Sequence, residues 1–384
     1  MRKKIINFLP IIAFSIIPSL LIWLPFFLRL ESFWSIPLPK EGMATVVANY
    51  DGPLYIIVAK SFYNPEVIKN TFSVPIPTEY FAAHFPLFPI LIKAFSFIFG
   101  YPYSMLVVTL ISSVVATYFF YKLVSDTTSE ANAIWLTFVF SVFPARWLIV
   151  RSVGSPEPLF VASIIASIYN FRKEKYLKAG LWGAAAQATK SPGILLFVAY
   201  FLYIFLKEFQ KFATSHLGTW FGKINPRSLS IFLIPASLLG VFVLYRETLN
   251  NFFAYFNSGD NIHLFFPPFQ VFNYKAPWVN THWLEEIIFL YIISIIGVVK
   301  LAKKEKVMAF FAGTFLFSIF FVSHRDIMRY ASPIFPFLIL AFADTLSKKE
   351  FKIALFLVII PIYLFALAFI SNNAMPIPDW TPYL

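Results

Sequence analysis

The sequence predicts an all-α polytopic membrane protein with about eleven transmembrane helices and a long first external loop that carries interfacial helices. Three observations lead to this prediction. Of the 384 residues, 59% are hydrophobic and only 13% are charged. Apolar runs long enough to cross a bilayer recur along the chain. The basic residues, which give a net charge of +12, form short clusters between these runs, as topology signals do.

The same observations bound the organisation of the chain and its partners. We expect a single membrane-embedded domain over residues 1–384 of a multi-pass cell-membrane protein, with no binding of nucleic acid. The chain has no cysteine, so disulfides, a thiolate nucleophile and a Cys-ligated metal are excluded. The histidines lack the spacing of a zinc site, and we expect neither a metal nor a cofactor.

The first apolar run covers residues 5–30 and follows Arg2, Lys3 and Lys4, which predicts a cytoplasmic N-terminus. A cleaved signal peptide is the alternative. The run is too long for a signal sequence and lacks a small-residue cleavage site. We therefore expect the first helix to stay attached.

Residues 31–103 form the predicted first external loop, because they are too polar and too rich in proline to span. Within this loop, residues 85–100 (FPLFPILIKAFSFIFG) are apolar but short, and Lys93 lies in their middle. If they crossed the membrane, every later basic loop would lie outside, against the positive-inside rule. We therefore expect this segment to lie in the membrane interface.

The later apolar runs complete the predicted topology. With residues 85–100 in the interface, the loops that contain Lys173 and Lys303 face the cytoplasm. The predicted spans after the first are 104–123, 131–150, 158–171, 177–189, 193–206, 229–245, 283–299, 307–322, 332–346 and 353–370.

Asp51 is the candidate catalytic residue. It precedes Gly52 and Pro53 shortly after the first span, where an ionised carboxylate can face substrates whose lipid tails stay in the bilayer. The alternative is that Asp51 only opens a turn, since Asp before Gly-Pro suits turn geometry.

Four predicted outer turns carry unusual charges. Arg146 and Arg151 end one span, Glu157 and Lys190 lie in proline-containing turns, and residues 324–330 read HRDIMRY. Charges so close to hydrocarbon need partners, which are either other side chains or an anionic ligand such as a phosphate. For Arg151 the alternative is a side chain that snorkels to the interface. Lys190 and Arg329 each lie where a predicted helix begins or ends next to proline, which suits a lipid-linked phosphate better than a solvated face.

The second long external loop, residues 246–282, is rich in aromatic residues, Asn and His. Stacked aromatic rings bind sugar faces and also anchor loops in the membrane interface, so both roles stay open. The chain has no glycine-rich phosphate loop and no soluble domain for a nucleotide sugar, which argues against soluble nucleotide donors.

Several short stretches occur in a recognisable order: YDGPLYIIVA at 50–59, HFPLFP at 84–89, FP at 143–144 with SPEPLF at 155–160, TKSPG at 189–193, and Arg329-Tyr330 with Pro333. In this order they resemble motifs of the membrane-embedded GT-C glycosyltransferases. Among these, the likeness is to the mannosyltransferases of the glycosylphosphatidylinositol pathway and their prokaryotic relatives. Proline on both sides of Glu157, and Lys190 in place of an arginine, depart from the family pattern and leave the sugar and the acceptor open.

The resemblance implies an inverting enzyme that transfers a hexose, expected to be mannose, from a polyprenyl-phosphate-linked donor to a lipid, glycan or protein acceptor at the outer face. Asp51 would take the acceptor proton. The residues that would bind and stabilise the leaving phosphate are Lys190, Arg329, Arg151 and Arg325. The expected substrate-binding residues are Tyr50, Tyr55, Glu79, His84, Glu157 and Tyr330.

A transporter or flippase of lipid-linked sugars is the competing interpretation. It would also need many helices and charges near a membrane face. Transporters place such groups near mid-membrane and show internal repeats, whereas here the charges collect at predicted outer ends and no repeat is evident.

Overall fold

The computed structural model describes residues 8–214, 225–273, 275–276 and 283–384, and this part of the chain is mostly helical. Its one sheet is a hairpin of β1 (Ser32–Phe33) and β2 (Ile36–Pro37). The predicted all-α class is therefore confirmed. Arg2, Lys3, Lys4 and the end of the second external loop lie outside the described residues, so the predicted side of the N-terminus stays a prediction.

Four helical segments of the described chain are long and apolar enough to cross a membrane: Phe8–Phe27, Leu87–Ser125, Pro226–Leu249 and Lys349–Asn372. The protein is a membrane protein. The other predicted spans coincide with helices that are shorter or carry more charge, so the number of crossings stays a prediction. Two of these spans are divided: 131–150 at Phe143-Pro144 and 332–346 near Phe342. Pro144 explains the first division, because proline has no backbone N–H to donate and restricts the residue before it.

The described chain forms two compact units, and we describe each by itself. Unit 1 comprises Met1–Ile76, Pro86–Ala162 and Phe342–Leu384. Its long helix α5 (Leu87–Ser125) contacts α1, α3 and α6, and α17 (Lys349–Asn372) contacts α1, α2 and α7. The other helices of unit 1 are α1 (Phe8–Phe27), α2 (Met43–Val47), α3 (Gly52–Ser61), α4 (Pro65–Thr71), α6 (Glu130–Val142), α7 (Ala145–Val150), α16 (Ala343–Leu346) and η8 (Thr381–Tyr383).

Helix α5 bends at Gly100, whose backbone has φ 68° and ψ 165°. This combination is open to glycine and strained for other residues. The helix before the bend coincides with the predicted interfacial segment, and Phe97 there is 88% exposed, as a lipid-facing side chain would be. The position of this half in the interface stays a prediction. After the bend, Thr109, Ser113 and Thr117 donate hydroxyl hydrogen bonds to carbonyls one turn earlier.

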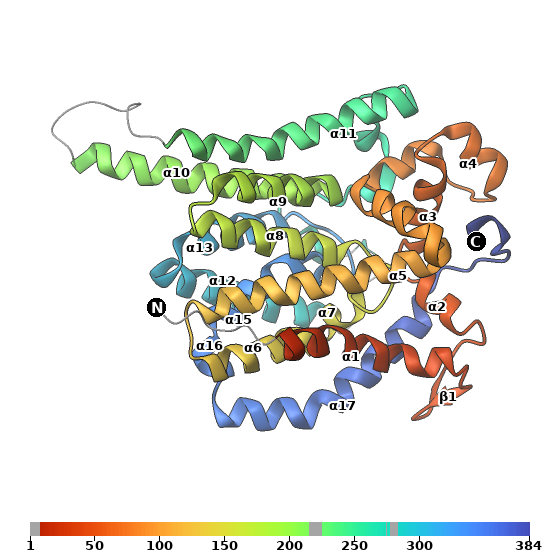
Figure 1. Cartoon of the computed structure of the whole chain (residues 1–384), viewed down its shortest axis with the longest axis horizontal. Helices are drawn as coiled ribbons and strands as arrows, with labels where there is room; N and C mark the ends of the chain where they lie inside the picture. Colours follow the sequence, from red (N-terminus) through yellow and green to blue (C-terminus); the bar gives the residue numbers. More distant parts are fainter. Residues whose placement is uncertain (1–7, 215–224, 274, 277–282) are drawn as a thin grey trace. The chain divides into compact units, whose positions relative to one another are not determined.

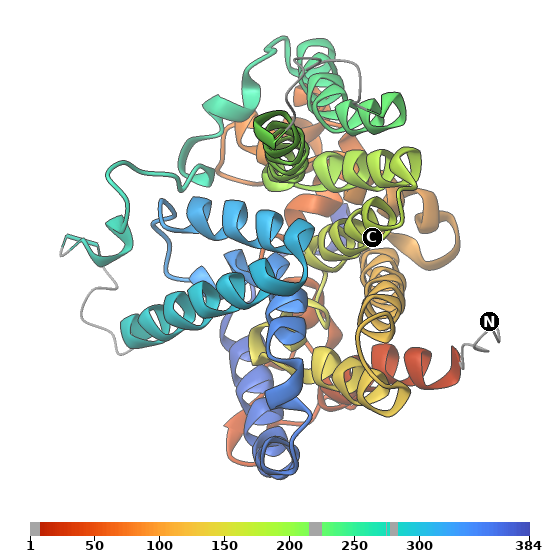
Figure 2. The ribbon, with the colours of Figure 1, turned by 90° about the vertical axis from the view of Figure 1, so that its left-hand side faces the viewer.

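Unit 2 comprises Pro77–Phe85 and Ser163–Ala341. Figure 1 shows α9, α10 and α11 side by side, and Figure 2 shows α12 beside α13. The helices of unit 2 are η1 (Thr78–Ala83), the later part of α8 (Glu157–Arg172), α9 (Tyr176–Thr189), η2 (Ser191–Gly193), α10 (Ile194–Thr214), η3 (Pro226–Phe232), α11 (Leu233–Leu249), η4 (Ala254–Asn257), η5 (Gly259–Asn261), η6 (Gln270–Phe272), α12 (Trp283–Lys304), α13 (Lys306–Ile319), α14 (Ile327–Tyr330), η7 (Ser332–Ile334) and α15 (Phe335–Ala341).

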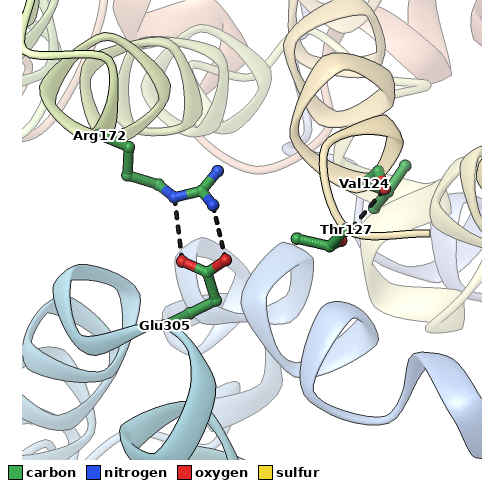
Figure 3. A network of polar contacts seen from close by, with 4 residues as sticks. All are labelled: Val124, Thr127, Arg172 and Glu305. Carbon is green, nitrogen blue, oxygen red and sulfur yellow. Dashed lines mark hydrogen bonds and ion pairs between the residues drawn. The ribbon is translucent and has the colours of Figure 1, made fainter.

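Two features hold the helices of unit 2 together. Gly180 lets α9 approach the chain before α11, because a Cβ there would lie 2.1 Å from the carbonyl oxygen of Ser230. At the end of α8, Arg172 forms a two-pronged ion pair with Glu305, the residue before α13 (Figure 3). Its Nε and Nη2 lie 3.0 and 2.6 Å from the two carboxylate oxygens. Such paired geometry fixes both side chains more firmly than a single contact.

Candidate functional site

Asp51 occupies the position directly before α3, and it is half-buried. Its carbonyl accepts the N–H of Tyr55 at 3.1 Å, and the N–H of Gly52 donates to the carbonyl of Asn49 at 3.1 Å. A Cβ at Gly52 would lie 2.1 Å from the carbonyl oxygen of Val47, so only glycine fits there. The turn that carries Asp51 is therefore held in one conformation at the start of a buried helix.

Tyr50 and Arg146 lie beside this turn in unit 1. Tyr50 has a left-handed φ of 50°, and its ring centroid lies 5.8 Å from that of Phe369. The Arg146 guanidinium lies 3.9 Å from the centroid of the Phe369 ring, and its Nη1 donates to the Tyr50 hydroxyl at 3.5 Å. Arg146 is thus a cation next to the Asp51 turn. In the sequence, Arg146 stood out because it lies in a predicted outer turn after the Phe-Pro pair. That position alone did not indicate a role for Arg146.

Tyr55 is a core residue of unit 1. It is 4% exposed, and its ring lies perpendicular to that of Phe88, with centroids 5.2 Å apart. This contact joins α3 to α5. The predicted role of Tyr55 in substrate binding stays a prediction.

Glu157 begins α8 and is 2% exposed. The turn before it packs on α5, because the Thr109 hydroxyl shares its hydrogen between the Met105 carbonyl and the Ser155 carbonyl, at 3.0 and 3.2 Å. A Cβ at Gly154 would lie 2.1 Å from Met105 Cε, and a Cβ at Gly52 would lie 3.1 Å from the same atom. The turns that carry Asp51 and Glu157 therefore pack against one methionine side chain. The sequence alone did not indicate that these two carboxylate turns meet.

Arg151 is fully buried in unit 1 and serves the packing of the helices. Its Nη1 donates to the Ser141 carbonyl at 2.8 Å, and its Nη2 donates to the carbonyls of Ser15 and Phe14 at 2.5 and 3.4 Å. The Phe14 carbonyl lacks its helical donor because residue 18 is proline. These contacts tie α6 and α1 to the residue after α7. We therefore do not carry Arg151 into the proposed phosphate site.

Lys190 lies in unit 2, directly after α9, and is half-buried. Its N–H donates to Ala186 and its carbonyl accepts from Gly193, at 3.1 and 3.0 Å. Beside it, Ser191 Oγ accepts a hydrogen bond of 2.9 Å from the Tyr255 hydroxyl. Burial raises the pKa of Tyr255, so this phenol stays protonated and donates at neutral pH. The second external loop is thereby fastened to the Lys190 turn.

The segment that carries Glu79 and His84 also belongs to unit 2. Glu79 is half-buried and His84 is 2% exposed. The Tyr245 hydroxyl donates to the Ala82 carbonyl at 2.7 Å, and the Phe85 ring lies perpendicular to that of Tyr255, 5.5 Å away. Since Tyr255 also binds Ser191, its ring and hydroxyl connect the His84 segment to the Lys190 turn.

Arg329 and Tyr330 lie in α14, with Arg325 exposed before it. The Asp326 carboxylate caps this helix by accepting from the N–H of Arg329 at 3.4 Å. Both Arg329 and Tyr330 are half-buried. One short segment therefore carries two cations, Arg325 before the capped helix and Arg329 within it.

Residues 263–269, within the predicted second external loop, run along residues 320–323 of unit 2. Phe265 N–H donates to the Phe321 carbonyl, and Ser323 N–H donates to the His263 carbonyl, at 2.8 and 2.9 Å. This pairing brings the His263 ring to 4.6 Å from that of His324 and to 5.8 Å from that of Tyr330. Two imidazole rings therefore lie beside Tyr330 of the predicted RY motif.

No group of three His, Cys, Asp or Glu side chains within the described ranges could hold a metal ion. The structure gathers Asp51, Tyr50, Arg146 and the Glu157 turn in unit 1. It gathers Lys190 with the Glu79 and His84 segment through Tyr255 in unit 2, which also contains Arg325, Arg329 and Tyr330.

The fold is similar to that of solved structures of ArnT and AglB, which are GT-C membrane glycosyltransferases. Among solved structures, ArnT from Cupriavidus metallidurans bound to undecaprenyl phosphate matches with a TM-score of 0.58 at 12% identity, over 90% of this chain and 63% of that one. Its apo structure gives a TM-score of 0.56 at 12% identity, over 90% and 61%. The oligosaccharyltransferase AglB from Archaeoglobus fulgidus, in complex with an inhibitory peptide and a dolichol-phosphate, gives 0.50 at 12% identity, over 96% and 57%.

This chain therefore spans 57 to 63% of the length of these proteins. No protein-family model and no curated protein sequence matches it.

Proposed function

We propose that the protein is an inverting glycosyltransferase that moves a hexose, which we expect to be mannose, from a polyprenyl phosphate to an acceptor hydroxyl. The observation that carries this proposal is the Asp51 turn, held in one conformation by Gly52 within a GT-C fold. The undecaprenyl phosphate in the ArnT structure and the dolichol-phosphate in the AglB structure support a polyprenyl phosphate as the carrier.

In the proposed reaction, the acceptor oxygen bonds to the anomeric carbon of the donor while the bond from that carbon to the phosphate oxygen breaks. The bonding electrons leave with polyprenyl phosphate, and Asp51 takes the hydroxyl proton. Glu157 lies in the turn that shares Met105 with the Asp51 turn, and we assign it to orienting a sugar hydroxyl or a cation.

The leaving phosphate needs cations where negative charge develops. We assign this role to Lys190, Arg329 and Arg325, and we add Arg146 because it adjoins the Asp51 turn. The acceptor is a lipid, a glycan or a protein, and the rings of His263, His324 and Tyr330 are candidates to contact it. We place this chemistry on the extracytoplasmic side.

The test uses purified protein in detergent with a polyprenyl-phosphate hexose and with water in place of the acceptor hydroxyl, and it measures release of polyprenyl phosphate by hydrolysis. Release that depends on Asp51 supports the enzyme. In proteoliposomes, a flippase would move the intact donor between leaflets without cleaving it. If wild type and Asp51→Asn both move the donor between leaflets without cleaving it, the protein is a transporter and the proposed enzyme activity is wrong.

A further inference from the structure

Asn49 lies two residues before Asp51 and is fully buried, and its amide reaches a helix from the other end of the chain. Its Nδ2 donates to the Thr45 carbonyl and to the Ile370 carbonyl, both at 2.9 Å. Its Oδ1 accepts from Nδ2 of Asn373 at 3.3 Å. Both amide hydrogens and the amide oxygen are thereby bonded. Aspartate would lose the two donors, and alanine would leave buried carbonyls without partners.

The backbone around Asn49 makes a second connection to the same segment. Residues 49 and 374 form an antiparallel bridge, and Met375 N–H donates to the Ala48 carbonyl at 2.7 Å. On the other side, the Asn49 carbonyl accepts the N–H of Gly52. One residue therefore joins the end of α17 to the turn that carries Asp51.

The conformation of the turn requires such a restraint. Tyr50, between Asn49 and Asp51, has a φ of 50°, which is disfavoured for a residue with a large side chain. Residues of this kind persist only where the surroundings hold them. The helix that follows is secured by its own core, because every residue of α3 except Lys60 is buried. Loss of the Asn49 contacts should therefore release the turn while α3 stays folded.

We propose that Asn49 is a positioning residue for Asp51, and that the end of α17, at Ile370 and Asn373, is part of the device that holds the reactive turn. The proposal rests on the proposed function for the role of Asp51. It assigns to Asn49 a part in the reaction without contact with either substrate.

The test compares Asn49→Asp and Asn373→Ala with a matched control, Asn372→Asp. Asn372 is an exposed neighbour on α17, and its Nδ2 donates to the Ala368 carbonyl at 2.8 Å. Sites that bind undecaprenyl phosphate are counted, and the rate of donor cleavage is expressed per site. For Asn49→Asp we expect this rate to fall about 10- to 100-fold with unchanged affinity, as for a displaced catalytic group. The rate per site should fall less for Asn373→Ala, and it should not change for the control.

A second measurement does not need activity. The native chain has no cysteine, so Asp51→Cys gives one thiol in the turn, and its reaction rate with a soluble thiol reagent reports how firmly the turn is held. Adding Asn49→Asp or Asn373→Ala should raise the labelling rate, roughly tenfold for the first, by local opening. The Asn372→Asp background should not.

The outcomes separate the two proposals. Unchanged labelling in both Asn49→Asp and Asn373→Ala overturns the role of Asn49, and so does faster labelling with an unchanged rate per site. Loss of binding sites in proportion to activity shows a structural role and overturns it as well. If Asp51→Asn cleaves the donor like wild type, the proposed function of Asp51 fails, and the labelling alone then decides whether Asn49 holds the turn.

Discussion

Arg146 and Arg151 lie five residues apart on one segment, yet their surroundings differ in kind. The Nη atoms of Arg151 donate hydrogen bonds to three backbone carbonyls inside unit 1. Arg146, in contrast, is half-buried beside Tyr50. From the sequence both are arginines at the outer end of a predicted span. The difference depends on carbonyls of α1 and α6, one of which is freed by Pro18, and no local pattern around Arg151 shows these partners.

This difference gives a prediction about phosphate binding. Lys190→Ala, Arg329→Ala and Arg146→Gln should each weaken undecaprenyl phosphate binding by about 1.5 to 3 kcal/mol per charged hydrogen bond lost. Titration of the purified variants with that lipid measures the effect. Arg151→Gln should instead lower the melting temperature, since it removes buried contacts between α1, α6 and α7. Normal lipid affinity in all three variants of the first group would remove these cations from the site.

A prediction about Asp51 separates the base from its neighbour. Asp51→Asn keeps the shape of the side chain and removes the proton acceptor, so the rate should fall by about 10² to 10⁴ with donor binding largely intact. The rate should fall less for Glu157→Gln. Turnover of the lipid-linked hexose under single-turnover conditions measures both. A near-normal Asp51→Asn beside an inactive Glu157→Gln would move the base to Glu157.

Helix α3 and the turn before it show what a whole element contributes to the site. The Asp-Gly-Pro pattern predicts a tight turn at Asp51, and the structure places α3 directly after it. The contacts that define the turn come from elsewhere: Met105 of α5, Phe369 of α17 and the carbonyl of Val47. A sequence pattern indicates a turn, but it does not show which distant elements pack on it.

Glycine substitutions test this element. Gly52→Ala places a Cβ 2.1 Å from the backbone carbonyl oxygen of Val47, a clash that no side-chain rotation relieves, so we expect loss of activity and a lower melting temperature. Gly240→Ala in α11 is the matched control, because a Cβ there meets nothing within 4 Å. Its melting temperature should be unchanged or higher. Equal behaviour of the two variants would show that the close contact at Gly52 does not constrain the turn.

The pairing of the second external loop with residues 320–323 also lies beyond sequence reasoning. The aromatic residues of 246–282 indicated either a binding surface or an anchor, and they fit both. Backbone hydrogen bonds from Phe265 and Ser323 decide where that loop lies within unit 2, and backbone groups have no sequence signature. Its contact with substrate stays a prediction.

Hydropathy and charge placed the whole molecule in its class. The apolar runs, separated by basic clusters, predicted a helical membrane protein, and the fold confirms this class. The predicted boundary at Gly100 coincides with the bend of α5. The number of crossings is harder to predict, because short helices such as α9 and α15 are held by neighbouring helices as well as by lipid.

The side of each loop gives the last prediction. Residues 85–100 should not cross, so Lys93 lies outside and Lys303 inside. Both side chains are exposed, and the native chain contributes no background thiol. Lys93→Cys in intact cells should react with an impermeant maleimide added outside, and Lys303→Cys should react only after permeabilisation. External labelling of Lys303→Cys would reverse the assigned topology.

The bond between Asn49 and the Ile370 carbonyl joins groups 321 positions apart. Synthesis at about 5 to 20 residues per second separates their emergence from the ribosome by roughly 15 to 65 s. During that interval the Asp51 turn exists without the partners that hold it. The turn that carries Asp51 is therefore complete only when α17 has been made, so a chain that ends before residue 370 lacks the contacts that hold this turn.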